Sequence, residues 1–363
     1  MIYPISDNRT KSKGITMKRS KTLLKSTMMA LLAWGSTSGY GQIREDNYAQ
    51  AMAEFAEPNF NAGDFSFFTG KDGASLRYGF FPANELATDT IVLLTGRSEE
   101  MEKYIELIYD FNQLNYNVFS MDHRGQGRSD RLHDKNDSGH VDSFFDYTAD
   151  LATFMDTIVK PNSSGRIFLF AHSMGGAVAT SYFKKNPDAV EAAVLSAPLL
   201  TLETGDFPPL VSQIIANVGS LVPDLQTSYV LGQGPASFDY DFEGSDASSR
   251  ARYEYARDGR IARSEFQLGG PSFQWVKEIM NFTTIITLPG WAESVTTDML
   301  LFQAEVDTFV RPKGQNRFCE HAPNCELRRV QGVAAPSKHS LYFTDDATRD
   351  QYLEEIHDFF QSH

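Results

Sequence analysis

Short, continuous apolar runs recur along the chain and alternate with stretches whose apolar residues repeat every three or four positions. The runs are typical of strands buried on both faces, and they lie at 90–94, 117–121, 167–170, 192–196, 299–302 and 327–330. The periodic stretches predict helices across 101–111, across 142–159, from Met174 onward and around Tyr352. This alternation predicts an α/β fold with a mostly parallel sheet flanked by helices.

The alternation stops between residues 198 and 296, in a stretch rich in Pro, Gly, Ser and aromatic residues. Because this stretch is too long for a connecting loop, we interpret it as an inserted cap. The chain then divides into a core at 42–197 and 297–363 and a cap at 198–296. The cap contains two apolar clusters, at 207–215 and 273–282, whose apolar faces need a partner.

Residues 1–41 have the order of a secretory signal peptide. Met17 precedes a basic stretch, an apolar run follows at 28–34, and small and polar residues continue to Gly41. The apolar run is too short to span a bilayer comfortably. We therefore expect cleavage near Gly41 and an exported protein, periplasmic or secreted. An uncleaved leader would instead associate the protein with the inner membrane.

The net charge of the chain is −14, although residues 1–41 carry seven Lys or Arg residues against the single acid Asp7. An acidic body argues against nucleic acid as a partner, because binding DNA or RNA requires a basic face. The two cysteines, Cys319 and Cys325, are expected to form one disulfide in an exported protein. The sequence has no Gly-rich phosphate loop and no cluster with clear metal-ligand spacing, so we expect neither a cofactor nor a metal.

The segment 168–176 is the strongest sign of chemistry, because in it an apolar strand meets a helix through a turn of the pattern small-x-Ser-x-Gly. This pattern is typical of a nucleophile elbow, which lifts a serine hydroxyl above the end of a sheet. Ala171 stands at the first small position, where one methyl group is tolerable. We predict that Ser173 is the nucleophile.

A serine hydroxyl needs a base, and the base needs an orienting acid. After a nucleophile elbow the chain order is Ser, then Asp or Glu, then His. His339 lies in a loop after a late strand and before the last helix, so we predict that it is the base. Asp307 follows the end of the strand at 299–303 and is the predicted acid, with Glu305 as the alternative on the same loop.

Acyl transfer also needs hydrogen-bond donors for the oxyanion. One should be the backbone N–H of Met174, directly after the nucleophile. The other should be the backbone N–H of Arg97, in the loop after the strand at 90–94, where Gly96 lets the main chain fold toward the serine.

Several motifs together resemble the α/β-hydrolase superfamily, in its bacterial lysophospholipase and monoacylglycerol lipase branch. They are DHRGQGRS at 122–129, GHV at 139–141, the elbow, and GGPS at 269–272 with Trp275. The similarity covers roughly residues 65–360. It implies a triad of Ser173, Asp307 and His339 beneath a cap. The chain departs from the usual pattern at Thr95-Gly96, where relatives have His-Gly or Pro-Gly.

We therefore expect a serine hydrolase that cleaves carboxylic esters of single-chain lipids, with transient contact between the cap and a membrane surface. A short-chain carboxylesterase and a proline aminopeptidase are alternatives on the same scaffold. For an aminopeptidase, the cap acids Glu243, Asp246 and Glu254 are candidates to hold an α-amine. A non-catalytic binding protein of this fold is a further alternative, although all three triad residues are present.

Overall fold

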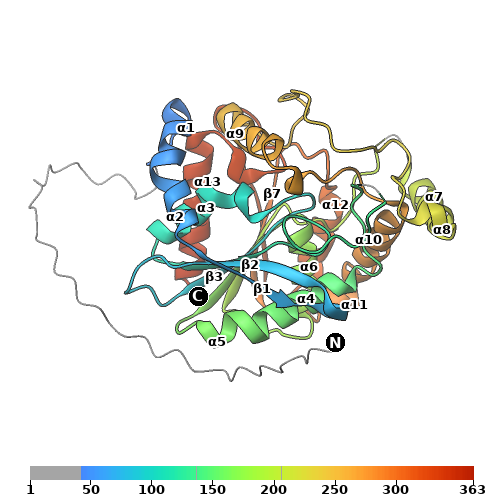
Figure 1. Cartoon of the computed structure of the whole chain (residues 1–363). Coiled ribbons are helices and arrows are strands. Elements are labelled where there is room, and N and C mark those ends of the chain that lie inside the picture. The colour runs from blue at the N-terminus through green and yellow to red at the C-terminus, as the bar shows by residue number, and fades with distance from the viewer. Residues whose placement is uncertain (1–41, 136, 206) are drawn as a thin grey trace, which may run out of the picture. The chain divides into compact units, whose positions relative to one another are not determined.

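A single sheet with the strand order β1-β2-β4-β3-β5-β6-β7-β8 lies at the centre of the fold (Figure 1). The computed structural model describes residues 42–363 apart from 136 and 206, so the predicted leader at 1–41 lies outside the described residues. Strands β3 to β8 run parallel, and β2 pairs antiparallel with β1 and β4, which confirms the predicted fold class. The strands are β1 (Asp64–Thr69), β2 (Ser75–Phe81), β3 (Thr90–Leu94), β4 (Asn117–Met121), β5 (Ile167–His172), β6 (Ala192–Ser196), β7 (Asp298–Gln303) and β8 (Cys325–Arg329).

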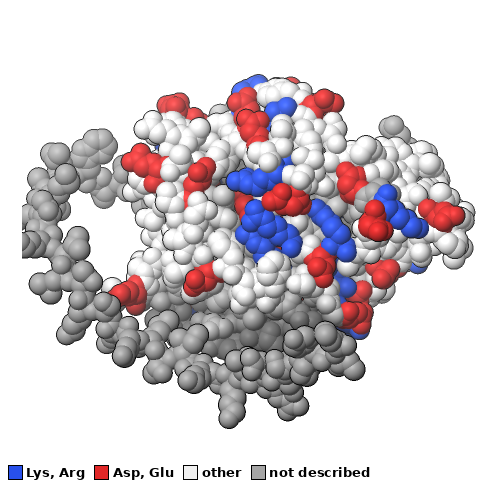
Figure 2. All heavy atoms as spheres, in the orientation of Figure 1, with Lys and Arg blue, Asp and Glu red and all other residues white. Residues whose placement is uncertain are grey.

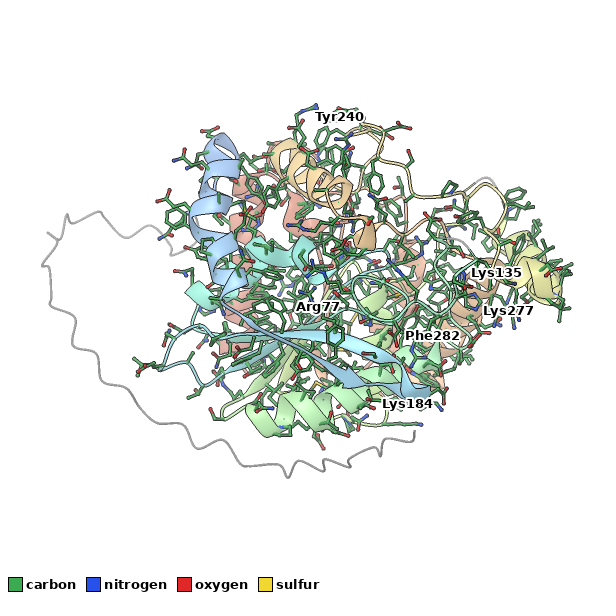
Figure 3. The ribbon with its side chains drawn as sticks, viewed as in Figure 1. Arg77, Lys135, Lys184, Tyr240, Lys277 and Phe282 are labelled. Carbon is green, nitrogen blue, oxygen red and sulfur yellow. A yellow bond between two sulfur atoms is a disulfide. The ribbon has the colours of Figure 1, made fainter. Side chains whose placement is uncertain are left out.

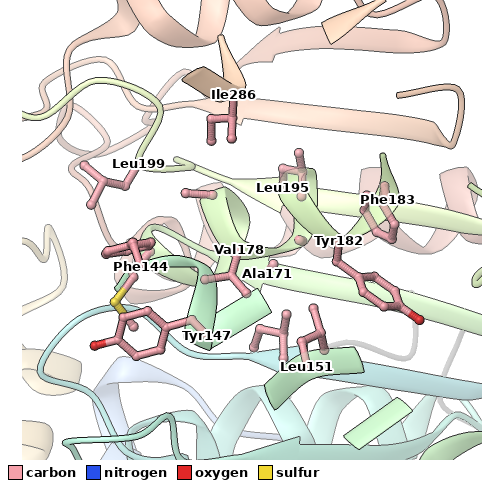
Figure 4. Packing of buried hydrophobic residues seen from close by; sticks show 14 of the residues in the cluster. Phe144, Tyr147, Leu151, Ala171, Val178, Tyr182, Phe183, Leu195, Leu199 and Ile286 are labelled. Carbon is pink, nitrogen blue, oxygen red and sulfur yellow. The ribbon is translucent and has the colours of Figure 1, made fainter. Parts of the chain in front are cut away.

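The central strands bury side chains on both faces of the sheet, as their continuous apolar runs predicted. In β3, Val92 and Leu94 belong to one core cluster and Ile91 and Leu93 to another, because successive strand side chains point to opposite faces. Figure 4 shows part of the first cluster, including Val178 of α6 and Leu195 of β6. The first cluster is covered by α4 (Phe145–Phe154), α6 (Met174–Phe183) and α12 (Pro312–His321), and the second by α3 (Ile105–Gln113) and α13 (Asp346–Gln361).

The segment before the sheet forms short helices that the sequence pattern did not predict. They bury Tyr48, Met52 and Phe60 in the second core cluster. The hairpin of β1 and β2 follows and was also not predicted. The short helices before the sheet are η1 (Glu45–Asn47), α1 (Tyr48–Ala51), η2 (Met52–Ala56) and α2 (Glu57–Asn61). The other short helical elements of the core are η3 (Lys71–Gly73), η4 (Met101–Tyr104), η5 (Met155–Val159), α5 (Lys160–Asn162) and η7 (Leu341–Phe343).

The long segment between β6 and β7 separates into two parts in space. Helix α10 packs against α6 and α7, whereas α9 packs against α1. Phe282 of α10, which Figure 3 labels, contacts the ring of Phe144. The apolar cluster at 273–282 is therefore part of the core, but the cluster at 207–215 leaves Leu210 and Ile214 more than half exposed. The elements of this segment are α7 (Pro209–Ser220), α8 (Pro223–Gln226), α9 (Arg250–Ile261), η6 (Ser264–Phe266), α10 (Phe273–Ile286) and α11 (Pro289–Ala292).

The predicted disulfide is present between Cys319 in α12 and Cys325 at the start of β8, with 5.0 Å between the two Cα atoms. It links a helix to the edge strand of the sheet. In the loop-entropy description, a link over so short a loop stabilises the folded state by about 2–3 kcal/mol.

Candidate active site

Ser173 lies in the turn between β5 and α6, at the carboxyl end of a central strand. Its backbone has φ 50° and ψ −114°, a conformation that is unfavourable for a residue with a side chain and that is typical of a nucleophile elbow. The turn also excludes side chains at its neighbours. A Cβ atom on Gly175 would lie 2.7 Å from the Thr95 carbonyl oxygen, and one on Gly176 would lie 2.6 Å from Pro198 Cβ.

The structure brings together the three residues that the sequence predicted as a triad. His339 Nε2 lies 2.9 Å from Ser173 Oγ, and His339 Nδ1 lies 2.7 Å from Asp307 Oδ2. The first distance lets the imidazole accept the hydroxyl proton, and the second fixes the tautomer that carries its proton on Nδ1. The three residues come from separate loops, after β5, after β7 and before η7. This geometry is suited to acyl transfer through a serine nucleophile.

Asp307 and Glu305 lie on the same loop but have different partners. Burial acts to raise the pKa of Asp307, but the hydrogen bond and the charge of His339, with the backbone N–H groups of Phe309 and Val310, hold this pKa below its usual value. Glu305 instead accepts hydrogen bonds from the backbone N–H groups of Gly332 and Ser337. Glu305 therefore secures the loop that leads to His339, and Asp307 faces the imidazole.

A second imidazole, that of His172, packs against His339. The rings of His172 and His339 are 4.8 Å apart, and His172 Nδ1 lies 3.2 Å from the Ser196 carbonyl oxygen. Burial lowers the pKa of His172 to about 3, so its ring is neutral at physiological pH. His172 thus packs beside the elbow, and its ring places no positive charge next to the imidazole of His339.

Two backbone N–H groups are available where the oxyanion hole was predicted. Among the described residues, neither Met174 nor Arg97 donates its backbone N–H to another protein atom. The neighbouring N–H of Gly96 is held by Glu99, and a Cβ atom on Gly96 would lie 2.5 Å from Glu99 Oε2. The hydrogen bond to Glu99 therefore fixes the position of the loop after β3 at Gly96. The assignment of the two donors to an oxyanion hole stays a prediction.

A buried charged network, which the sequence did not reveal, connects the loop after β3 to the loop that carries His339. Lys103 Nζ lies 2.6 Å from Glu99 and 2.9 Å from Asp246. Asp246 in turn accepts a hydrogen bond from Ser340, the residue after His339. The separation of Glu99 and Lys103 by four positions was a visible signal, but nothing in the sequence marked Asp246 as their partner.

The residues of the DHRGQGRS stretch hold loops in place. Arg124 binds Asp150 through two nitrogen atoms, at 2.5 and 2.7 Å. Asp122 accepts hydrogen bonds from the backbone N–H groups of Met101 and Arg128. Likewise His140, of the second motif, lies 3.0 Å from the Ser272 hydroxyl oxygen. Within the described residues, no group of three or more His, Cys, Asp or Glu side chains is arranged to hold a metal ion.

Residues 87–336 match the model of a protein family described as serine aminopeptidase, S33. Lysophospholipase L2 of Escherichia coli K12 is 32% identical over 316 residues, which cover 83% of this chain and 88% of that protein. The monoglyceride lipase homolog of monkeypox virus is 25% identical over 264 residues, covering 72% of this chain and 85% of the viral protein.

Solved structures share the fold. A monoglyceride lipase of Saccharomyces cerevisiae superposes with a TM-score of 0.62 at 18% identity, over 83% of this chain and 97% of the yeast chain. A carboxyl esterase of Bacillus coagulans gives a TM-score of 0.63 at 16% identity, over 83% of this chain and 98% of its own. The chain thus belongs to the α/β-hydrolase family described as serine aminopeptidase, S33, and is a serine hydrolase homologous to lysophospholipase L2 and to monoglyceride lipases.

Proposed function

We propose that this protein hydrolyses the carboxylic ester of a single-chain lipid, a lysophospholipid or a monoacylglycerol, through an acyl-enzyme in which Ser173, His339 and Asp307 form the triad. The observation that carries this proposal is the hydrogen-bonded series Ser173 Oγ, His339 Nε2, His339 Nδ1 and Asp307 Oδ2. The homology to lysophospholipase L2 over most of both chains supports the choice of a lipid ester.

The reaction proceeds in two halves. Ser173 Oγ attacks the ester carbonyl carbon while His339 Nε2 takes the hydroxyl proton, and the backbone N–H groups of Met174 and Arg97 stabilise the oxyanion. The carbon–oxygen bond to the glycerol then breaks, and His339 returns the proton to the leaving alcohol. Water attacks the acyl-enzyme with His339 again as the base, which releases the fatty acid and restores Ser173.

The three acids considered for an aminopeptidase do not form an amine site. Asp246 is paired with Lys103 and Ser340, and Glu254 accepts a hydrogen bond from Tyr240. Glu243 is exposed and lies 3.7 Å from Arg250. An α-amine would have to displace these partners, so the structure favours an ester over an N-terminal peptide as the substrate.

We expect kcat/KM to rise along a series of p-nitrophenyl esters from acetyl to lauroyl. Each buried methylene stabilises a bound acyl chain by about 0.8 kcal/mol, or about fourfold, until the site is filled. Lysophosphatidylcholine should be hydrolysed faster than diacyl-phosphatidylcholine, because a site for one chain excludes the second. Steady-state kinetics test both expectations. A maximum at acetyl or butyryl esters without turnover of lysolipid would identify a short-chain esterase instead.

The apolar surface of α7 is the feature that we propose contacts a lipid aggregate. Leu210, Ile214, Val218 and Leu221 are each more than half exposed, whereas Gly219 on the other side of the helix packs against the ring of Phe273. Exposed apolar side chains that gather on one face of a helix are typical of an interaction site. Within the described part of the chain, no helix is long and apolar enough to cross a membrane.

The double variant Leu210→Glu with Ile214→Glu should lose activity on lysolipid vesicles by about tenfold or more, because burying one such side chain contributes about 1.5–3 kcal/mol. The loss on soluble p-nitrophenyl butyrate should be much smaller. Leu86→Glu is the matched control, since Leu86 is 90% exposed on the loop between β2 and β3. Equal losses for both substrates, or for Leu86→Glu, would contradict a lipid contact through α7.

We also propose that the protein is exported and that its leader is removed near Gly41. The basic, apolar and small-residue order of 17–41 supports this proposal, as does a disulfide, which persists in oxidising compartments. Fractionation of the native host with N-terminal analysis of the purified protein tests it. A chain that starts at Met17 and is recovered from the cytoplasm with two free thiols would contradict export.

A further inference from the structure

Arg97, whose backbone N–H is a predicted oxyanion donor, has a side chain with an unusual environment. Its Nη2 donates to the Gly269 carbonyl oxygen at 2.7 Å, and its guanidinium lies 5.2 Å from the centre of the Trp275 ring. Its Nε is buried and, among the described residues, has no hydrogen-bond partner. The GGPS segment and Trp275 therefore hold this guanidinium without neutralising it.

Arg97 is only partly buried, and the fully buried arginines Arg77, Arg124, Arg252 and Arg349 are all neutralised. Each has a carboxylate oxygen within 3 Å: Arg77 with Glu102, Arg124 with Asp150, Arg252 with Glu106, and Arg349 with Asp110. Arg77 is labelled in Figure 3, and the basic side chains on the surface in Figure 2 also lie beside acidic ones. For Arg97 no ion pair is found with any acid in the described residues.

Such a cation is costly unless an anion joins it. Burial lowers the pKa of Arg97 to about 10, so the guanidinium remains charged at neutral pH despite its surroundings. A partly buried cation without an acidic partner has lost part of its hydration, so a negatively charged ligand that contacts this guanidinium would gain a charge-assisted hydrogen bond.

There is room for a ligand beside it. Arg97 lines a cavity of about 300 Å³ that is also lined by Arg260, by residues 232–238, by Phe266 and by residues 268–270, with no acid among the lining residues. Gly139 also keeps the guanidinium accessible, because a Cβ atom there would lie 3.2 Å from Arg97 Nη2. The glycines of the GGPS motif thus line a polar recess, and of its two arginines Arg260 is paired with Glu100 whereas Arg97 is not paired with an acid among the described residues.

Arg97 connects the recess to the elbow through the residue that precedes it. Gly96, the residue before Arg97, packs so closely against the elbow that a Cβ atom on it would lie 3.0 Å from His172 Cδ2. In a lysophospholipid, the glycerol backbone separates the scissile ester from the phosphate by only a few bonds. An ester carbonyl at the backbone N–H of Arg97 would therefore place the phosphate within reach of the same residue's side chain.

We propose that the Arg97 guanidinium binds the head-group phosphate of a lysophospholipid and thereby favours this substrate over an uncharged monoacylglycerol. This inference rests on the proposed lipid ester hydrolysis. Arg97 is then a specificity residue, whose side chain binds the phosphate while its backbone N–H donates to the oxyanion. The planar fork of a guanidinium suits two phosphate oxygens, which an ammonium does not reproduce.

The test compares lauroyl-lysophosphatidylcholine with monolauroylglycerol, which present the same acyl chain. For Arg97→Gln, the ratio of kcat/KM for the two lipids should fall by about tenfold or more, mainly through KM for the lysolipid, because a charge-assisted hydrogen bond is lost. For Arg97→Lys, this ratio should lie between that of the unmodified protein and that of Arg97→Gln. Arg260→Gln is the matched control, since Arg260 lines the same cavity but is paired with Glu100, and it should change the ratio by less than about twofold.

Fluorophosphonate labelling of Ser173 verifies that each variant retains its catalytic serine. An unchanged ratio in labelled Arg97→Gln would overturn the proposal, as would equal changes in Arg97→Gln and Arg260→Gln. Loss of labelling and of both activities would also overturn it, since Arg97 would then support the loop alone. If the unmodified protein hydrolysed neither lipid, the proposed function itself would fail.

A competition experiment separates a head group from free phosphate. Glycerophosphocholine should inhibit monolauroylglycerol hydrolysis by the unmodified protein, and Arg97→Gln should weaken this inhibition by about tenfold. Inorganic phosphate at the same concentration should inhibit less. Equal inhibition by both compounds would point to a general phosphate site and contradict recognition of the head group.

Discussion

Ser173→Ala is expected to lower kcat/KM for ester hydrolysis by at least about 10³-fold, because the nucleophile and its base act as one unit. His339→Ala should cause a loss of similar size, since without an acceptor at 2.9 Å the Ser173 hydroxyl keeps its proton. The double variant should be little worse than either single one. Steady-state kinetics on p-nitrophenyl laurate measure all three.

The matched control for the histidine is His357→Ala. His357 lies in α13, where its Nδ1 is 3.4 Å from the Tyr116 hydroxyl oxygen, and it makes no contact with the triad. The substitution should change kcat/KM by less than about threefold, because its main effect is a modest change in the free energy of unfolding. Circular dichroism confirms that each variant is folded. Turnover by folded Ser173→Ala within tenfold of the parent would contradict the nucleophile, and absent fluorophosphonate labelling of the unmodified protein would favour a binding protein.

The central strands could be predicted from sequence because burial on both faces produces an unbroken apolar run, as at 90–94 and 192–196. The first two strands could not. β1 has the sequence DFSFFT, yet only Phe68 in it is buried, and Phe67 is more than half exposed. Its pairing with β2 places it at the edge of the sheet, where the tertiary context and not the hydrophobic pattern determines the structure.

The three triad positions could be proposed from the order of residues along the chain, because each follows or precedes a recognisable strand or helix. Charge pairing could not be proposed in this way. Lys103 and Asp246 are 143 positions apart, and their contact depends on how the inserted segment folds back onto the core. The same holds for Arg97, since the sequence shows a positive charge but not the absence of an acidic neighbour.

The structure separates the two acids of the loop after β7 by their partners, so that exchanging each carboxylate for an amide should have very different effects. Asp307→Asn should reduce kcat by about 10⁴-fold, because an amide NH₂ facing His339 Nδ1 favours the tautomer with its proton on Nε2, which cannot accept from Ser173. The loss should lie in kcat and not in KM, since Asp307 acts through its hydrogen bond to His339.

Glu305→Gln is the matched control, and it should retain most of the activity. An amide oxygen still accepts hydrogen bonds from the Gly332 and Ser337 backbones, so the loop that leads to His339 keeps its support. A modest fall in thermal stability is expected, because the ionised carboxylate binds these N–H groups more strongly than a neutral amide. Steady-state kinetics and thermal unfolding of both variants at pH 7 determine which of the two residues is the acid of the triad. Severe loss in Glu305→Gln with a mild effect in Asp307→Asn would assign the acid to Glu305, because only the residue that orients the imidazole controls the proton on Nδ1.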